Sequence, residues 1–330
     1  MTNLQKENPR IIFSVIIPTF NRGYLIGKTL TSLISQSYPK DLYEIIVVDN
    51  NSTDDTRRIV QNWITISNGL IKLFSEGNQG SHFARNGAVK HAKGNILYFT
   101  DDDIIADPDM LSNIVVGFAL DDNVGTVSGC VKPLWETPPP EWVLKYCNNY
   151  LLSLFDMDKE QYLSDSDFGV YSCHQAVLKE AFIKAGGYNP DIVNGEWVGD
   201  NETGLNIKLK SLGYKFAFIR SAVVWHRIPP SRMTQSYLNN RLGNQGNVDT
   251  ITEYREFHYS NAEIEYKIDE IRRKLARQVL RFLKDKLQNK DSWHLKRAYI
   301  NYYLHRNKFF TKILCENDFR ELTLRDNWIQ

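Results

Sequence analysis

Apolar runs and segments of helical spacing alternate along the first 131 residues of the chain. Residues 11–17 and 43–48 are near-continuous apolar, β-branched runs, which is typical of strands buried on both faces of a parallel sheet. Shorter runs at residues 71–74 and 96–100 predict two further strands. Helical spacing lies between these runs, over residues 24–35, 52–63 and 81–90. The alternation predicts an open, doubly wound α/β sheet.

The pattern changes after residue 131, where prolines and tryptophans make an irregular segment up to residue 167. Beyond it, we expect a short strand over residues 168–172 and a helix over residues 175–185. A further helix over residues 201–212 is closed by Gly213. Two more strands and three helices are expected after it, over residues 215–219, 222–225, 233–242, 263–287 and 293–310.

Polar residues stand where the strands of the first half are expected to end. They are Pro18, Asp49, Asn78 and the consecutive acids Asp101, Asp102 and Asp103. Ligands of doubly wound sheets bind beyond the carboxyl ends of the strands. The sequence therefore predicts one common site at this edge of the sheet.

The three acids suggest what this site binds. Carboxylates packed at a strand end repel one another unless a cation neutralises them. Asp oxygens suit Mg²⁺ or Mn²⁺, which proteins usually hold through one or two carboxylates together with substrate phosphates. The functional interpretation is a divalent cation that carries a phosphorylated ligand. The alternative is that the acids only start the helix expected near Leu111.

The distribution of charge and the cysteine content indicate a basic segment in an otherwise acidic chain and a cellular compartment. The net charge of the 330-residue chain is +1, but residues 267–312 hold 14 Lys or Arg against 4 Asp or Glu, which leaves −9 for the rest. The cysteines at positions 130, 147, 173 and 315 fit no zinc or redox spacing. Residues 1–10 have no apolar signal-peptide core, and no run approaches the ~18 apolar residues of a membrane span. We therefore expect a cytoplasmic protein.

Three further features have both a functional and a structural interpretation. The segment from Gly23 to Thr29 has three residues between its glycines, where the phosphate loop of a nucleoside triphosphatase needs four. Asp200 and Glu202 stand at a helix start, either as favourable charges at the helix dipole or as a general base. His226 follows a strand, either as a structural residue or as a metal ligand.

Several motifs together resemble glycosyltransferase family 2. They are Ser14-Val-Ile-Ile-Pro18-Thr-Phe-Asn-Arg22, Ile46-Val-Val-Asp49-Asn-Asn-Ser52-Thr-Asp54, Asn78-Gln-Gly80 with Ala84-Arg85-Asn86-Gly87-Ala88, and Phe99-Thr-Asp101-Asp-Asp103. Two later stretches, Asp200 to Tyr214 and Val224 to Gly246, also resemble patterns of that family. The resemblance covers residues 11–246. It implies an A-type glycosyltransferase (GT-A) fold, which is Rossmann-like with a mixed, mainly parallel sheet, here followed by a C-terminal helical extension.

The resemblance also implies a domain organisation and a reaction. Residues 1–250 would form the catalytic domain, with a nucleotide-sugar-binding half at 11–131 and an acceptor and catalytic half at 132–250. Residues 251–330 would form a basic helical extension. The implied reaction transfers a sugar, with inversion, from a nucleoside diphosphate sugar, for which uridine diphosphate is the expected carrier.

Individual residues receive roles by the same resemblance. The ends of the first two strands would hold the nucleotide base, the third motif the phosphates, and the first acid of the triplet the ribose and sugar. The residues implied for the donor are Pro18, Thr19, Phe20, Asn21, Asp49, Asn78, Arg85, Asp101 and Asp102. Asp103 would bind Mn²⁺ or Mg²⁺, and His226 is the candidate second ligand.

The catalytic base is where the chain departs from the family pattern. The family places an Asp in the later helix, and alignment backwards from Gly213 puts Glu202 at that position. Glu is longer by one methylene, so either Glu202 or Asp200 could serve, and Glu202 is preferred. Because of this departure, a catalytically impaired nucleotide-sugar-binding protein is the alternative to an active enzyme.

The basic tail bears on partners and location. Residues 267–312 mix Lys and Arg with aromatic residues, so this segment could lie on an anionic membrane surface or pack on the catalytic domain with solvated basic faces. The expected partners are a nucleotide-sugar donor and a glycan or lipid-linked acceptor in cell-surface polysaccharide synthesis. No nucleic acid is expected. The membrane interpretation places the protein at the inner face of the cell membrane.

Overall fold

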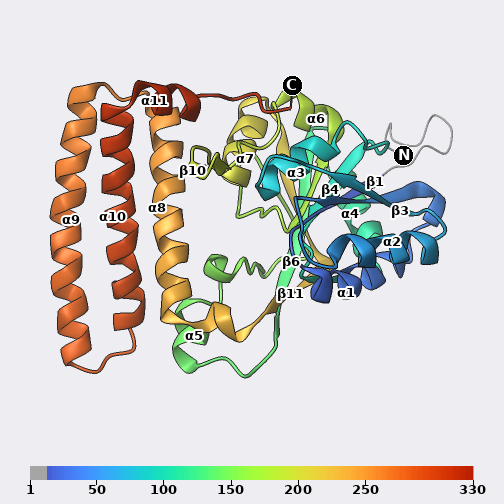
Figure 1. Ribbon diagram of the computed structural model, residues 1–330, viewed down its shortest axis with the longest axis horizontal. Helices are drawn as coiled ribbons and strands as arrows, with labels where there is room; N and C mark the ends of the chain where they lie inside the picture. The colour runs from blue at the N-terminus through green and yellow to red at the C-terminus, as the bar shows by residue number, and fades with distance from the viewer. Residues whose placement is uncertain (1–12, 330) are drawn as a thin grey trace.

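The computed structural model describes residues 13–329, so the expected strand residues Ile11 and Ile12 and the segment 1–10 lie outside the described residues. Figure 1 shows a central sheet flanked by helices, with a layer of long helices beside it. The strands of the sheet are β1 (Phe13–Thr19), β2 (Tyr43–Asp49), β3 (Ile71–Ser75), β4 (Ile96–Thr100), β5 (Ile104–Ala106), β6 (Val124–Trp135), β7 (Gln161–Ser164), β8 (His174–Leu178) and β11 (Lys215–Ile228). A separate pair consists of β9 (Ile192–Val193) and β10 (Glu196–Trp197).

Eleven α-helices are described between residues 13 and 329. Those of the sheet domain are α1 (Gly23–Ile34), α2 (Thr56–Ile66), α3 (Ser81–Ala88), α4 (Met110–Phe118), α5 (Glu141–Tyr146), α6 (Lys179–Lys184) and α7 (Asn201–Ser211). The rest are α8 (Gln235–Phe257), α9 (Asn261–Leu287), α10 (Trp293–Cys315) and α11 (Asn317–Thr323). Short 3-10 turns lie at Lys40–Leu42, Tyr150–Leu152 and Pro230–Met233.

The nine-stranded sheet has the order β3-β2-β1-β4-β8-β6-β11-β5, with β7 paired to β11. β3, β2, β1 and β4 are parallel neighbours, and β6 is parallel to β11. β8 runs antiparallel between β4 and β6, and β5 and β7 are antiparallel to β11. The predicted α/β fold with a mixed sheet is therefore confirmed.

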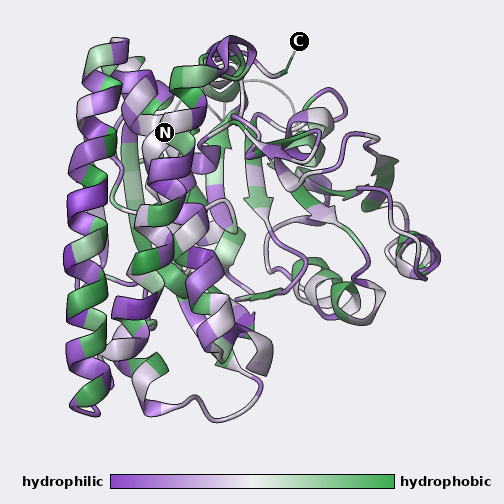
Figure 2. Cartoon of the chain, turned by 60° about the vertical axis from the view of Figure 1, so that its left-hand side comes forward, coloured by the Kyte–Doolittle hydropathy of each residue, from purple (hydrophilic) through white to green (hydrophobic). Residues whose placement is uncertain are grey.

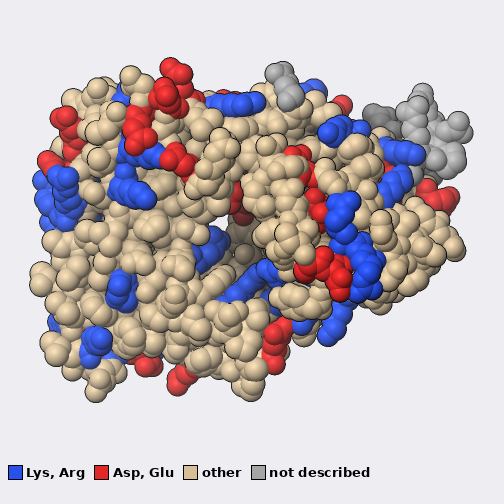
Figure 3. Space-filling view, viewed as in Figure 1, with Lys and Arg blue, Asp and Glu red and all other residues tan. Residues whose placement is uncertain are grey.

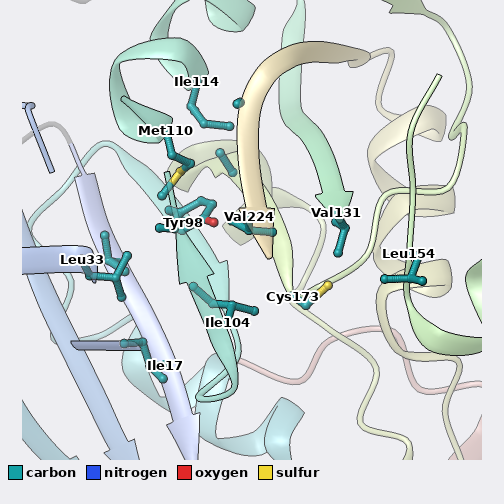
Figure 4. Packing of buried hydrophobic residues seen from close by; sticks show 14 of the residues in the cluster. Ile17, Leu33, Tyr98, Ile104, Met110, Ile114, Val131, Leu154, Cys173 and Val224 are labelled. Carbon is teal, nitrogen blue, oxygen red and sulfur yellow. The ribbon is translucent and has the colours of Figure 1, made fainter. Parts of the chain in front are cut away.

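Apolar side chains cover both faces of the sheet, because successive residues of a strand point to opposite sides. On β1, Val15 and Ile17 join a core that includes α1, α2 and α4, whereas Ile16 joins the core of α3, α6 and α7. Figure 4 shows Met110 of α4 against Tyr98 in the first core. Two-sided burial explains why the first strands read as continuous apolar runs.

The region between residues 168 and 185 was predicted wrongly. Residues 168–172 form a loop rather than a strand, and β8 occupies the first residues of the expected helix, which is reduced to α6. β8 begins with His174 and Gln175, which are fully buried and polar. His174 bonds Tyr98 and the Ala222 carbonyl, and Gln175 bonds Asn206. These distant partners satisfy the polar groups inside a central strand, and a sequence pattern does not reveal them.

The two strands expected between residues 215 and 225 are one strand, β11, with a register shift between Ile219 and Val223. The long helices α8, α9 and α10 stand side by side as a layer. Their core includes Ile251, Ile268 and Phe310. α8 crosses the boundary expected at residue 250, so the helical layer begins at Gln235.

Hydropathy follows this architecture. Figure 2 shows green strands in the sheet and alternating purple and green along the long helices. Within residues 13–329, no helix combines the length and the apolar character required to cross a bilayer.

Candidate functional site

The carboxyl ends of β1, β2 and β4 meet at one edge of the sheet because these strands are parallel neighbours. A pocket of about 440 Å³ opens at this edge. Of the residues predicted for the donor and the metal, it is lined by Pro18, Thr19, Phe20, Arg85, Asp101, Asp102 and Asp103. The residues added by the structure are Arg22, Asn50, Gln79, Ser81, His82, Ser172 and Arg232. We call this space the donor-side pocket. Figure 3 shows the molecule's surface charges, with acidic and basic side chains close together over the sheet domain.

Asn21, Asp49 and Asn78 do not line this pocket but shape the loops around it. The Asn21 side-chain oxygen accepts a bond of 2.8 Å from a backbone amide in the loop before α2. Asp49 is buried at the end of β2 and pairs with Arg57 at 2.8 Å. The Asn78 side chain turns to Glu76, with its amide 3.0 Å from Oε1.

The first two acids of the triplet have different surroundings. Asp101 is partly exposed and pairs with the buried guanidinium of Arg85. Asp102 is buried and accepts a bond of 2.7 Å from the Thr19 hydroxyl at the end of β1. Burial raises the pKa of Asp102 to about 7. The triplet therefore connects β4 to α3 through one acid and to β1 through the next.

Asp101, Asp103 and His226 offer ligand atoms that lie within 4.8 Å of one another. His226 Nδ1 donates to the Leu152 carbonyl at 3.0 Å, so Nε2 is the ligand atom; it lies 3.4 Å from Asp103 Oδ1 and accepts a hydrogen bond from Arg232, which a bound cation would replace. Asp103 Oδ1 is buried and has no hydrogen-bond partner among residues 13–329. Two carboxylates and a neutral imidazole suit Mn²⁺ and also accommodate Mg²⁺, and the unpaired oxygen is the kind of group that a cation would satisfy. The residues present therefore fit a divalent cation.

Positive side chains surround the third acid. Arg232 donates to Asp103 Oδ2 at 2.8 Å and to His226 Nε2 at 2.6 Å. Arg22 lies 3.7 Å from the same Asp103 oxygen. Burial on its own would raise the pKa of Asp103, but the guanidinium charges of Arg232 and Arg22 hold it below its usual range. The carboxylate is therefore ionised in the folded protein.

The two candidates for the general base lie in different environments. Asp200 is 1% exposed and accepts from Asn189 Nδ2 at 2.6 Å and from Thr252 Oγ1 at 3.2 Å. Arg255 Nε forms an ion pair with Asp200 Oδ2 at 3.4 Å. Asp200 thus joins the start of α7 to α8 and faces away from the donor-side pocket. Its oxygens are already bonded, which is the arrangement of a structural carboxylate.

A larger cavity of about 800 Å³ lies on this other side of α7. Two cations on its wall are already bonded by the protein. Lys208 donates to the Gly187 carbonyl, the Asn189 side chain and the Asp326 carbonyl, at 2.7, 2.9 and 2.9 Å. Arg255 pairs with Asp200 and with Asp326. The cavity is therefore a joint between α7, α8 and the C-terminal segment, whose main cations are engaged by the protein itself.

Glu202 lies on the opposite side, next to His82 of α3. His82 Nε2 is 3.6 Å from Glu202 Oε2, and His82 Nδ1 is 3.3 Å from Asp191 Oδ1. The Glu202 side chain is 22% exposed. Burial acts to raise the pKa of Glu202, but the adjacent His82 and the charge of Arg241 lower it overall. Glu202 is thus an ionised, accessible carboxylate beside a residue of the donor-side pocket.

Sequence reasoning assigned no role to His82, Arg22 or Arg232, although the last two lie within the quoted motifs. His82 stands three residues before Arg85, and such residues share one face of a helix. That spacing was a usable signal, because Arg85 was already a candidate. The placement of Asp191 against His82 depends on the tertiary fold and has no local signal.

Comparison with known proteins gives a consistent result. Residues 14–186 match the family model described as glycosyl transferase family 2. The chain is 43% identical over 90 residues to the glycosyltransferase AglE of Haloferax volcanii, which is 27% of this chain and 30% of that protein. It is 45% identical over 92 residues to the GalNAc(5)-diNAcBac-PP-undecaprenol beta-1,3-glucosyltransferase of Campylobacter jejuni, which is 27% of this chain and 29% of that protein. The matches thus span less than a third of either relative.

A solved structure resembles the chain over most of its length. It is the mannosyltransferase PcManGT of Pyrobaculum calidifontis in complex with GDP-Man and Mn²⁺, with a TM-score of 0.57 and 21% identity. The match covers 95% of this chain and 83% of that one. At this level of identity, the likeness concerns the fold, which agrees with the architecture expected from the sequence.

Proposed function

The chain belongs to glycosyl transferase family 2, and on this premise we propose that it transfers a sugar, with inversion, from a nucleoside diphosphate sugar to an acceptor hydroxyl. The observation that carries the proposal is the convergence of Asp101, Asp103 and His226 at the carboxyl edge of the sheet. Glu202 lies close by, in contact with His82 of the same pocket.

The donor-side pocket has the side chains that a nucleoside diphosphate requires. Arg22, Arg85 and Arg232 supply guanidinium groups, which bind phosphate oxygens. Phe20 is 44% exposed and offers an aromatic face beside them. We assign the base to the ends of β1 and β2, near Pro18 and Asn50, and propose uridine as its identity.

Asp101, Asp103 and His226 would hold Mn²⁺ or Mg²⁺. A cation bound there would neutralise negative charge on the leaving diphosphate. Arg85 supports the same charge from α3, because its Nε is buried and has no hydrogen-bond partner among the described residues. Preorganised positive groups of this kind stabilise a leaving group at little reorganisation cost.

Glu202 is the general base of the proposal. Its carboxylate takes the proton of the acceptor hydroxyl as that oxygen forms a bond to the anomeric carbon. The bond between this carbon and the diphosphate oxygen breaks in the same displacement, which inverts the configuration. Asp200 is not assigned this role, because Asn189, Thr252 and Arg255 already bond its oxygens.

We propose that the acceptor is a glycan or a lipid-linked glycan of cell-surface polysaccharide synthesis. The name of the Campylobacter jejuni relative describes an undecaprenol-linked acceptor, which supports this choice. The segment from residue 131 to 172 lies beside the donor-side pocket, through Leu152 against His226 and through Ser172 in its wall. It is the natural place for the acceptor.

We further propose that the second half of α9 contacts an anionic membrane. Leu280, Leu283 and Leu287 are 68%, 46% and 86% exposed on one helix face. Arg281 and Lys284 beside them make no ion pair with any described residue. Exposed leucines between basic side chains suit the surface of an anionic bilayer.

Vesicle sedimentation tests this contact. Binding should require anionic lipid, weaken at high salt, and fall when both Leu280 and Leu287 are replaced by Ser. The matched control replaces Leu304 of α10, which is 47% exposed. Equal binding to neutral vesicles, or no binding at low salt, would contradict the proposed contact of α9 with an anionic membrane.

A transfer assay tests the main proposal. Release of nucleoside diphosphate should require a divalent cation and a glycan acceptor, and it should be lost in Glu202→Gln. Cation-dependent nucleotide binding without any turnover, across a panel of donors and acceptors, would favour the impaired binding protein instead. Turnover of ATP or GTP in place of a nucleotide sugar would contradict both.

A further inference from the structure

His82 is a buried imidazole for which the proposed transfer has so far no use. It is 4% exposed, lines the donor-side pocket, and stacks obliquely on Tyr188 with the ring centres 5.1 Å apart. Its Nδ1 is bonded to Asp191, but its Nε2 has no hydrogen-bond partner within the described residues. Glu202 Oε2 lies 3.6 Å from this nitrogen. A buried polar nitrogen without a partner is costly, so its position points to a functional role.

The charges around this imidazole favour its protonated form. Burial lowers the pKa of His82, but Asp191 and Glu202 raise it above the ordinary value, against an opposing contribution from Arg85. Asp191 is itself held ionised, because His82 and two backbone amides lower its pKa despite burial. Two carboxylates thus face one imidazole from opposite sides, and a shared positive charge is the stable arrangement.

The other groups around Glu202 do not compete with His82. Tyr171, Cys173 and Tyr188 face it, and burial raises the pKa of each, so they stay neutral. Arg241 of α8 adds positive charge, as the smaller cationic contribution to the lowered pKa of Glu202. Asp101 is paired with Arg85. His82 is therefore the cationic neighbour in direct reach of the Glu202 carboxylate.

We propose that His82, fixed by Asp191, is a positioning residue for the base: its cation keeps Glu202 ionised and holds its carboxylate beside the donor-side pocket. This inference rests on the proposed function of Glu202. The Glu202 side chain has one more rotatable bond than an Asp would have, and its carboxylate needs a partner to fix it. His82 provides it from α3, whose Arg85 faces the diphosphate end of the same pocket.

The test compares pH profiles of turnover. Gln at position 82 keeps a donor of similar reach but carries no charge, so His82→Gln should raise the pKa of Glu202. The acidic limb of the kcat profile should then move to higher pH by about one unit, with kcat near neutrality reduced about tenfold or less. The KM for the donor should change little. His91→Gln is the matched control, because His91 stacks on Phe74 away from the pocket.

Two outcomes would overturn the proposal. If His82→Gln raises the donor KM and leaves the pH limb in place, His82 binds the nucleotide and does not position the base. If neither quantity changes, the contact is only structural.

An NMR titration separates this inference from the proposed function, because it needs no turnover. The His82 imidazole should titrate above its ordinary range in the wild type and at lower pH in both Asp191→Asn and Glu202→Gln. A titration insensitive to Glu202→Gln would refute the pairing, whether or not the protein transfers sugar.

Discussion

The two acids at the start of α7 give the sharpest prediction, because we assign them opposite roles. Asp200→Asn should cost stability, whereas Glu202→Gln should cost catalysis. Asp200 is 1% exposed and is bonded by Asn189, Thr252 and Arg255. Glu202 is 22% exposed and approaches His82 no closer than 3.6 Å.

The magnitude follows from what each substitution leaves behind. Asn at position 200 removes the negative charge that faces Arg255. It also replaces one of the two acceptor oxygens of the carboxylate by an NH2 group. Removing one partner of a buried ion pair costs about 3–5 kcal/mol, and Arg255 keeps Asp326 as a second partner, so we expect a loss of about 3 kcal/mol. For Glu202→Gln, the loss should be smaller, about 1–2 kcal/mol, because Glu202 is 22% exposed, lies no closer than 3.6 Å to His82, and leaves that imidazole its bond to Asp191. Loss of a general base lowers kcat by about 10²–10⁴.

Urea unfolding followed by tryptophan fluorescence gives the stabilities, and initial rates at saturating donor give kcat. Asp200→Asn should show a lower unfolding midpoint with kcat within about tenfold of the wild type. Glu202→Gln should show the reverse. If folded Asp200→Asn loses turnover while Glu202→Gln keeps it, the assignment of the base to Glu202 is wrong.

Three further predictions concern the metal site, the joint behind α7 and the core. Asp103→Ala should abolish cation-dependent turnover while circular dichroism shows an intact fold; an unchanged rate would reject the metal site. Gly204→Ala would bring a Cβ into collision with Asp200 Oδ1 and Asn189 Nδ2, so urea unfolding should show a loss of about 2–3 kcal/mol, and a neutral result would mean that α7 is free to shift. Burial lowers the pKa of His174 to about 4, so at this residue the unfolded state binds more protons between about pH 6.5 and 4, and the stability of the wild type relative to His174→Gln should fall by about 3 kcal/mol as the pH decreases through that window. A His174→Gln variant with the same pH dependence of unfolding would refute this cause.

The fold was largely predictable because its first strands are buried on both faces. Val15, Ile46 and Leu97 lie in continuous apolar runs whose meaning does not depend on distant partners. The prediction missed β8 for the opposite reason. His174 and Gln175 can lie in a central strand only because side chains from elsewhere in the fold form hydrogen bonds with them. Local propensity has no access to such partners.

The candidate site residues also differ in whether the sequence alone could indicate them. The acids at the end of β4 were candidates from the sequence, since Asp101, Asp102 and Asp103 directly follow a buried strand, where their mutual repulsion favours a bound cation, and the structure places all three in the wall of one pocket. His82 was missed, because its meaning comes from Asp191, which is 109 residues away along the chain. The choice between Asp200 and Glu202 also needed the structure, because Thr252 and Arg255 of α8 bond the first acid and not the second.

The most direct test of the central claim is binding of the donor with its cation. Thermal unfolding should be measured with a panel of nucleoside diphosphates and nucleotide sugars, with and without Mn²⁺. Because a ligand that binds only the folded state raises the midpoint, we predict a Mn²⁺-dependent rise with uridine diphosphate and its sugars that disappears in Asp103→Ala. A rise with another nucleotide would correct the base, and no rise with any nucleotide would contradict the donor site itself.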